Sequence, residues 1–206
     1  MVPRSLMFVL MLSLLCLMIP TVAAADAGVD FSNAGGTLAG SDAGLSLSGS
    51  TLVAVLCFNG NGLITGDLGT VTFSTGELTS GSMQTGGTFA AGGSFTITGN
   101  GTNGIPSGTL FTGSFSSPVT WSLLTLGNGT HNYTLQGTLT GTAGGASVNA
   151  VTAQLTISTG TKLFSGSTTM AGGDTTVGSV PEPSTLAMFG TGAVGLLGVL
   201  RRKLQR

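Results

Sequence analysis

The centre of this 206-residue chain alternates apolar residues with hydroxyl-bearing ones at a period of two. That period matches a half-buried β-strand, whose side chains point alternately into a core and into water. The pattern is clearest over residues 132–140, and it recurs at 70–74, 95–98 and 151–158. Glycine interrupts every stretch between residues 26 and 179 that could form a helix. The sequence therefore predicts an all-β domain.

Asn-Gly pairs separate these alternating segments and supply the positive φ angles that tight hairpin turns require. The clearest hairpin joins residues 119–126 to 131–140, with Trp121 and Tyr133 on its two arms and in reach of one core. Residues 53–58 are apolar on both parities, which indicates a central strand. We predict an antiparallel β-sandwich or small barrel of about 8–10 strands.

Charge is sparse and mostly acidic in the β-rich region, residues 26–170, and in the Gly-rich stretch 171–179, which we predict to be a linker. The acidic residues are Asp26, Asp30, Asp42, Asp67, Glu77 and Asp174, and Lys162 is the single basic one. A domain without a basic patch lacks the electrostatic footprint of a nucleic-acid partner, so we exclude that partner. Cys57 is the only cysteine here, which rules out an internal disulfide and favours a small buried hydrophobe.

Converging catalytic groups are not evident in this region. His131 is the only histidine, and no serine lies in a G-x-S-x-G nucleophile elbow. Asp67 and Glu77 are the one pair of acids worth testing as glycosidase-type carboxylates. One histidine, one cysteine and scattered acids lack the spacing of a metal site. We therefore expect no enzyme activity, no catalytic residues, no metal and no cofactor.

The N-terminal residues 1–25 have the three-part layout of a secretory signal peptide. Arg4 gives a weakly basic start, residues 6–19 are apolar except for one serine, and Pro20 ends the run. Ala23 and Ala25 then provide a small-x-small cleavage site. A permanent transmembrane span needs roughly 20 apolar residues. The apolar run is shorter, so we expect it to form a short signal helix.

Three elements follow one another at the C-terminus, residues 180–206. The first is the tag Val180, Pro181, Glu182, Pro183 and Ser184, which its two prolines hold extended. The second is the apolar segment 184–200, capped by Ser184 and long enough for a short transmembrane helix. The third is the basic tail Arg201, Arg202, Lys203 and Arg206, which stays cytoplasmic by the positive-inside rule and stops transfer.

Together these three elements resemble the PEP-CTERM sorting signal of Gram-negative bacteria, and the resemblance covers only the C-terminal tail. It implies recognition by an exosortase, a membrane-embedded transpeptidase, and removal of the basic helix near Pro181, Glu182 and Pro183. It also implies export through an inner-membrane intermediate, followed by display on the cell surface or release outside the cell.

For the β-domain we expect a structural or adhesive role in the envelope or the extracellular polysaccharide matrix, with exopolysaccharide as a further partner. One alternative is a sandwich that binds polysaccharide through exposed aromatics, or ice through a flat row of threonines. The threonines that suit such a row, if their strands stack in register, are Thr70, Thr72, Thr96, Thr98, Thr138 and Thr140. A second alternative is a secreted hydrolase, which needs His131 or two acids converging in a pocket.

Overall fold

The structure, a computed structural model, describes residues 28–178. They form one 13-stranded antiparallel sheet and a single short 3-10 turn, so the all-β prediction is confirmed. In chain order the elements are β1 (Val29–Ala34), β2 (Thr37–Ser41), β3 (Gly44–Leu56), η1 (Phe58–Gly60), β4 (Ile64–Ser74), β5 (Leu78–Ser82), β6 (Gly86–Phe89), β7 (Gly92–Asn100), β8 (Ser107–Phe115), β9 (Val119–Thr125), β10 (His131–Ala143), β11 (Ala146–Gly160), β12 (Ser167–Thr169) and β13 (Gly172–Val177).

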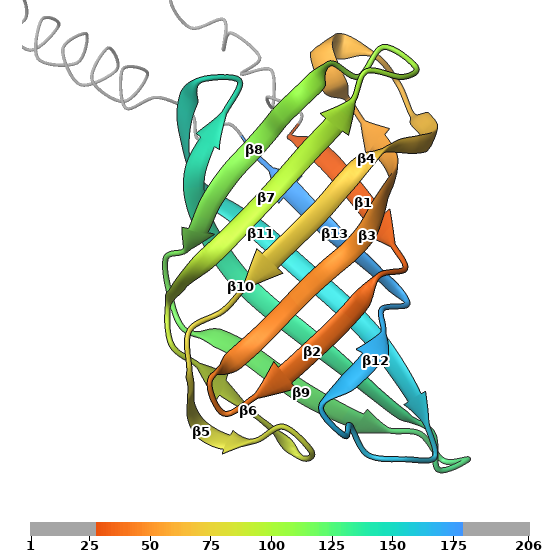
Figure 1. Ribbon diagram of the computed structural model, residues 1–206, viewed down its shortest axis with the longest axis vertical. Coiled ribbons are helices and arrows are strands. Elements are labelled where there is room, and N and C mark those ends of the chain that lie inside the picture. The colour runs from red at the N-terminus through yellow and green to blue at the C-terminus, as the bar shows by residue number, and fades with distance from the viewer. Residues whose placement is uncertain (1–27, 179–206) are drawn as a thin grey trace, which may run out of the picture.

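The sheet closes on itself into a barrel, as the strands crossing at the front and back of Figure 1 show. The closed path runs β11–β13–β1–β3–β4–β7–β8–β10, and β10 pairs with β11 to complete the ring. β2 and β12 branch from the ring at β3, while β9, β6 and β5 branch from it at β10. Of the two architectures that the sequence allows, closure of the ring distinguishes the barrel from the sandwich.

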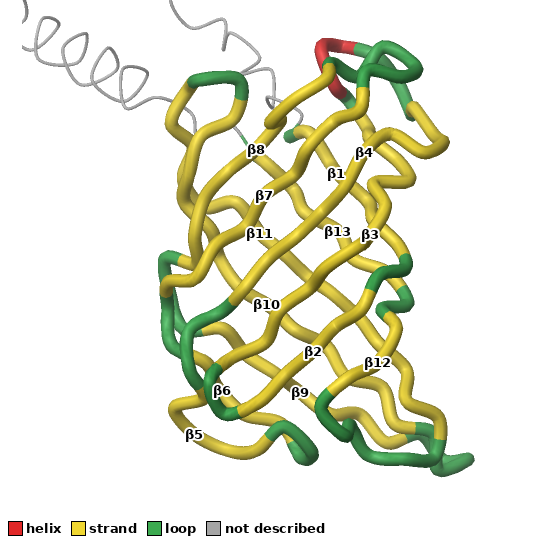
Figure 2. Tube along the Cα trace, viewed as in Figure 1, coloured by secondary structure: helices red, strands yellow, loops and turns green. Residues whose placement is uncertain are grey.

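β10 is the strand at which the ring divides. Along one edge it pairs with β11 over nearly its whole length. Along the other edge, residues 131–136 pair with β9 and residues 139–143 pair with β8. The predicted hairpin of residues 119–126 and 131–140 is thus confirmed. Figure 2 shows that the loops gather at the two ends of the barrel, leaving its wall almost entirely strand.

The inside of the barrel is filled by apolar side chains, many of them aromatic. Phe73 stacks on Phe95 with ring centroids 5.9 Å apart, and Phe115 meets both rings edge-on. Gly137 faces inward beside them, and a Cβ atom there would lie 2.5 Å from the Phe115 ring. Glycine at this position of β10 therefore makes room for the aromatic ring of Phe115, on the neighbouring strand β8.

A bulge at Val53 changes the inward parity of β3 at the start of the apolar segment 53–58. The register of β3 against β4 shifts between Leu52 and Ala54, so the inward face changes parity there. Leu52 and Val55 are consequently both fully buried although they are three residues apart. The strand is central, as predicted, with partners on both edges. It ends at Leu56, which leaves Cys57 half-buried in the following turn instead of within the core.

The sequence-based strand count of about 8–10 is too low. Four strands of five residues or fewer escape the alternation pattern, because so short a run shows at most two apolar repeats: β2, β5, β6 and β12. The predicted Gly-rich linker at 171–179 is also wrong over most of its length. Residues 172–177 form β13, which pairs with both β1 and β11.

The glycines of β13 serve packing. Gly173 is buried, and a Cβ atom on it would lie 2.8 Å from both Asn33 Oδ1 and the Leu155 side chain. Its strand is therefore held close to its neighbours only because it lacks a side chain. A high glycine content, which suggests a flexible linker in sequence, here marks tight approach of strands.

Several predictions concern residues outside 28–178. They are the signal helix with its cleavage site at Ala23 and Ala25, the tag from Val180 to Ser184, the transmembrane helix 184–200 and the basic tail at Arg201, Arg202, Lys203 and Arg206. Within the described range, the structure contains no helix with the length and apolar character needed to cross a membrane.

Candidate functional site

His131 begins β10, at the strand end that the sequence indicates. Its Nδ1 lies 2.9 Å from Oγ1 of Thr125, the residue directly opposite on β9. Its backbone carbonyl accepts a hydrogen bond from Thr159 Oγ1 on β11 at 3.4 Å. These contacts fix the loop end of the β9–β10 hairpin. In the described part of the chain, no carboxylate or serine hydroxyl hydrogen-bonds to the imidazole, so a catalytic triad is not assembled around it.

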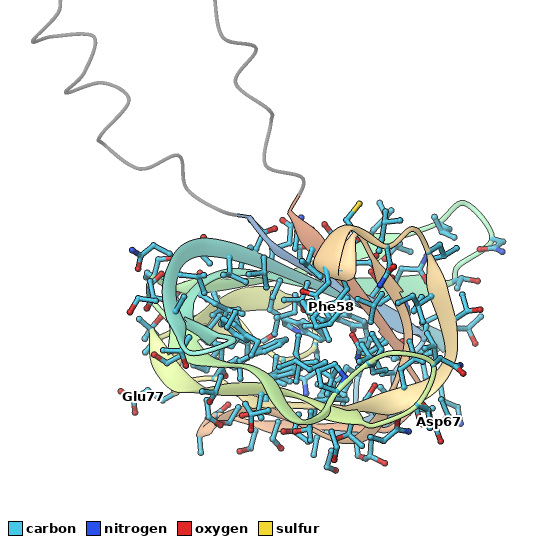
Figure 3. All side chains as sticks on the ribbon, turned by 90° about the horizontal axis from the view of Figure 1, so that it is seen from above. Phe58, Asp67 and Glu77 are labelled. Carbon is cyan, nitrogen blue, oxygen red and sulfur yellow. The ribbon has the colours of Figure 1, made fainter. Side chains whose placement is uncertain are left out.

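Asp67 and Glu77 lie on opposite sides of the barrel when it is seen from above (Figure 3). Asn100 Nδ2 and Thr102 Oγ1 donate to the Asp67 backbone oxygen at 3.0 and 2.8 Å, which ties the β7–β8 loop to β4. The Glu77 side chain is exposed in the β4–β5 connection. The two acids therefore do not form a glycosidase-type pair. Nor do the His, Cys, Asp and Glu residues of 28–178 gather in threes to suit a metal ion.

Trp121 and Tyr133 face the same core, as the sequence predicts, and their rings stack with centroids 5.0 Å apart. Both are buried, together with every other aromatic residue of 28–178 except the half-buried Phe58. Proteins that stack aromatic side chains against sugar rings need those side chains on the surface. The described surface therefore offers no aromatic platform for a sugar ring.

The wall formed by β4, β7, β8 and β10 carries two outward threonine rows in register, which we call the front threonine rows. The rows are Thr72–Thr96–Thr112–Thr142 and Thr70–Thr98–Thr109. Neighbouring hydroxyls are spaced by the distance between strands, about 4.8 Å. The condition of stacking in register is thus met for Thr70, Thr72, Thr96 and Thr98. It is not met for Thr138 and Thr140, which pair with Thr152 and Ser114 and lie outside these rows. The wall itself twists as it closes into the barrel, so the rows do not form an extended flat lattice.

The opposite wall is hollowed by a polar groove, which we call the back groove. It has a volume of about 540 Å³ and crosses β9, β10, β11 and β13. Its polar lining comes from Ser117, Thr120, Gln136, Thr138, Thr152, Gln154, Asp174 and Thr176. A smaller groove of about 290 Å³ adjoins it, since it shares Gln154 and Asp174 and continues to Ser32 on β1.

Strand register lines up the polar side chains of the back groove. Thr120, Gln136, Gln154, Asp174 and Ser32 are successive cross-strand neighbours, each directly opposite the next on five adjacent strands. The residues that alternate with them along β10 and β11 are buried in the core. The groove floor includes the backbone of Gly137, and that of the adjoining groove includes Gly172 and Gly173.

Most hydrogen-bonding capacity in the back groove faces water. Gln136 Nε2 donates to Gln154 Oε1 at 3.1 Å, which orients both carboxamides and leaves the Gln136 oxygen and the Gln154 amide group toward the groove. Asp174 makes no hydrogen bond or ion pair through its carboxylate within residues 28–178. Lys162, the one basic residue of that range, lies in the loop after β11 and does not line the groove.

Such a lining suits a neutral, hydroxyl-rich ligand. Carboxamides, a carboxylate and threonine hydroxyls donate to and accept from alcohol groups. A negatively charged ligand would meet Asp174 with no cation to offset it. The groove is shallow and open, so we expect weak contacts repeated along a chain rather than tight capture of one molecule.

The sequence places Gln136 and Gln154 on the wet faces of their strands, but it does not identify them as a site. Their pairing across β10 and β11 is a matter of register, which a one-residue slip would undo. The sequence does not identify Asp174 either, because its Gly-rich segment is predicted to be a linker and not a strand. The signal that identifies it is the weak alternation of Gly173, Thr175 and Val177, which turns Asp174 outward.

Comparison with known protein families identifies the C-terminal tail. Residues 179–203 match the family described as the PEP-CTERM protein-sorting motif. The tail is a PEP-CTERM sorting motif. The match includes Val180, Pro181, Glu182, Pro183 and Ser184, and three of the four basic residues, Arg201, Arg202 and Lys203.

The PEP-CTERM motif indicates exosortase-dependent sorting to the cell envelope, with processing by the exosortase and export to the surface or the exterior. The match does not extend into the barrel. No curated protein and no solved structure shows significant similarity to the chain. The role of the barrel must therefore be argued from its own geometry.

Proposed function

We propose that this chain is an exported, non-catalytic matrix protein whose barrel adheres to neutral polysaccharide through the back groove. The observation that carries the proposal is the row of hydrogen-bonding side chains from Thr120 to Ser32 across five strands. It combines an elongated shape with donors and acceptors that are uncharged except for Asp174, and these features suit a neutral glycan chain.

In this proposal the tail works before the barrel does. The apolar segment 184–200 spans the inner membrane while the basic residues Arg201, Arg202, Lys203 and Arg206 stay in the cytoplasm. An exosortase then cuts near Pro181, Glu182 and Pro183 and frees the barrel for the envelope or the extracellular matrix. Sparse charge and a surface rich in hydroxyl groups suit a protein that works within a hydrated polysaccharide.

Affinity electrophoresis tests the adhesive role. The protein is run through native gels containing a neutral glucan or an acidic polysaccharide, and its mobility is compared with that in an empty gel. We expect the neutral glucan to retard the parent protein and the double variant Gln136→Ala, Gln154→Ala to lose most of that retardation. The matched control is Thr72→Ala, Thr96→Ala in a front threonine row. Equal retardation of both double variants would refute the back groove as the binding site.

The front threonine rows favour ice as a second candidate ligand, because their hydroxyls repeat in register across four strands. We rank it below polysaccharide, since a twisted barrel wall presents only a few rungs of the lattice that ice demands. Inhibition of ice recrystallisation by the parent protein, abolished in Thr72→Ala, Thr96→Ala, would reverse that ranking. A secreted hydrolase is disfavoured by the separation of His131, Asp67 and Glu77.

A further inference from the structure

Both ends of the described chain leave the barrel at one point. Val29 on β1 and Val177 on β13 are paired residues, and the backbones of Gly28 and Gly178 lie side by side. In Figure 1 the first and last strands run together to the upper end of the barrel. The C-terminal segment therefore departs from this end and from no other part of the wall.

The turn between β3 and β4 lies at the same end. We call residues 57–63 the exit loop. It begins after Leu56, which pairs directly with Asp30 of β1, and it contains Phe58, labelled near the departing chain ends in Figure 3. The Leu63 side chain is 66% exposed and the Leu56 side chain 41% exposed, while Phe58 is half-buried against the core. This end of the barrel thus presents apolar side chains to its surroundings.

The exit loop has a defined backbone conformation. Cys57 and Asn59 adopt left-handed φ angles of 63° and 51°, which residues other than glycine rarely take. The Asn61 amide donates to the Phe58 carbonyl at 3.0 Å and closes the 3-10 turn, shown in red in Figure 2.

Chain length limits how far this end can lie from a membrane. Seven Cα–Cα steps separate Gly178 from Thr185, where the apolar stretch begins. Even fully extended, they span at most about 25 Å. A barrel tethered in this way keeps its upper end close to the bilayer, whereas its lower end, across the whole length of the strands, lies farther away.

Exposure alone does not select the exit loop. Leu124, Leu126 and Leu163 are 61%, 39% and 45% exposed at the lower end, where the β9–β10 and β11–β12 loops lie (Figure 1). The exit of the tail is what separates the two ends, because only one of them faces the membrane. The lower leucines therefore provide a matched comparison of similar exposure.

We propose that the exit loop is a membrane-contact surface, with Leu56, Phe58 and Leu63 inserting into the lipid interface while the tail is still attached. This inference rests on the proposed insertion of the segment 184–200. The contact is apolar, because the charged groups near this end, Asp30 and Asp67, are acidic and gain nothing from anionic lipid. Its consequence is an upright barrel that holds the scissile region at the membrane surface.

Quenching by brominated lipid tests the contact in the chain without its predicted signal peptide, residues 26–206. Cys57→Ser provides a cysteine-free parent, into which Leu63→Cys or Leu124→Cys is introduced and labelled with a polarity-sensitive fluorophore. Each protein is reconstituted into phosphatidylcholine vesicles with brominated acyl chains. We expect the probe at position 63 to be quenched about threefold more than the probe at 124, since an interfacial side chain lies at the boundary between headgroups and acyl chains.

Flotation of the same samples separates the two proposals. Chains that float with the vesicles but show equal quenching at positions 63 and 124 would overturn the exit-loop contact and leave tail insertion intact. Chains that fail to float would overturn both. Quenching at 63 that disappears as the protein-to-lipid ratio rises would assign the loop to contact between copies of the chain, and would overturn the lipid assignment. Native Trp121 fluorescence serves as the control for folding.

Discussion

The indole of Trp121 stacks on the phenol of Tyr133, with ring centroids 5.0 Å apart and planes inclined by 14°. Each ring also binds the turn between β5 and β6: Trp121 Nε1 donates to the Met83 carbonyl at 3.0 Å, and Tyr133 Oη donates to the Gln84 carbonyl at 2.7 Å. The Tyr133 hydroxyl accepts a further bond from the Phe164 amide at 3.1 Å. One aromatic pair thus joins two peripheral loops to the ring of strands.

Tyr133→Phe is expected to destabilise the barrel by about 1–3 kcal/mol, because it leaves the buried Phe164 amide and the Gln84 carbonyl without their partner. Urea unfolding followed by Trp121 fluorescence measures the change. Thr72→Ala, an exposed substitution on the front wall, should shift stability by less than about 0.5 kcal/mol. A Tyr133→Phe protein as stable as the parent would show that the hydroxyl does not hold these loops.

Gly137→Ala is expected to cost about 1–3 kcal/mol, because the new Cβ atom would lie 2.5 Å from the Phe115 ring in a filled core. Gly127→Ala is the matched control. Gly127 lies in the β9–β10 loop without a positive φ angle, and a methyl group added there would meet no atom within 4 Å. Thermal denaturation of the two variants should therefore give a lower midpoint for Gly137→Ala alone, and equal midpoints would contradict the packing argument.

Replacing Pro181, Glu182 and Pro183 by alanine is expected to leave the unprocessed protein in the inner membrane, since the variant lacks the tag of the sorting motif. Fractionation of the native host, with mass spectrometry of the C-terminus, measures processing. Pro106→Ala in the β7–β8 loop controls for proline loss elsewhere. Normal maturation of the triple variant would show that sorting does not depend on the tag.

Asp174→Asn is expected to change which polysaccharides the back groove accepts. Two unit charges about 4 Å apart in water interact by about 1 kcal/mol, so removing the carboxylate should raise retention by an acidic polysaccharide up to about fivefold. Retention by a neutral glucan should change much less. Affinity electrophoresis at low ionic strength measures both, and Asp67→Asn, on a different part of the surface, is the control. Equal effects of the two substitutions would place the charge effect outside the groove.

The sequence predicts the class of fold because the alternation of apolar and polar residues along a strand directly reflects which side chains are buried. Trp121 and Tyr133 are correctly assigned to one core because a short turn fixes the register of their hairpin. The same reasoning fails for β13, where Gly173 and Thr175 face inward and are too small to give an apolar signal. It also fails for closure of the ring, since β13 pairs with β1 from the opposite end of the described chain, and so distant a pairing leaves no mark in local sequence.

The candidate site divides in the same way. The tail can be recognised from sequence because its function depends on a linear order of residues that needs no fold. The back groove cannot be recognised from sequence, because Gln136, Gln154 and Asp174 become neighbours only through strand register. The polar character and outward parity of Gln136 and Gln154 are visible in the sequence of β10 and β11, whereas the alignment of the three residues into a row is a property of the sheet.

The pairing of Val29 with Val177 also bears on the order of events during secretion. β13 lies between β1 and β11, so the ring cannot be completed until the last described strand is available. A chain that crosses a membrane from its N-terminus delivers that strand at the very end of transit. Until then one edge of β1 is unpaired, and pairing between strands as far apart in sequence as β1 and β13 is slow. Assembly of the barrel is therefore timed by translocation: a polypeptide arrested before residue 172 would remain an open, association-prone sheet.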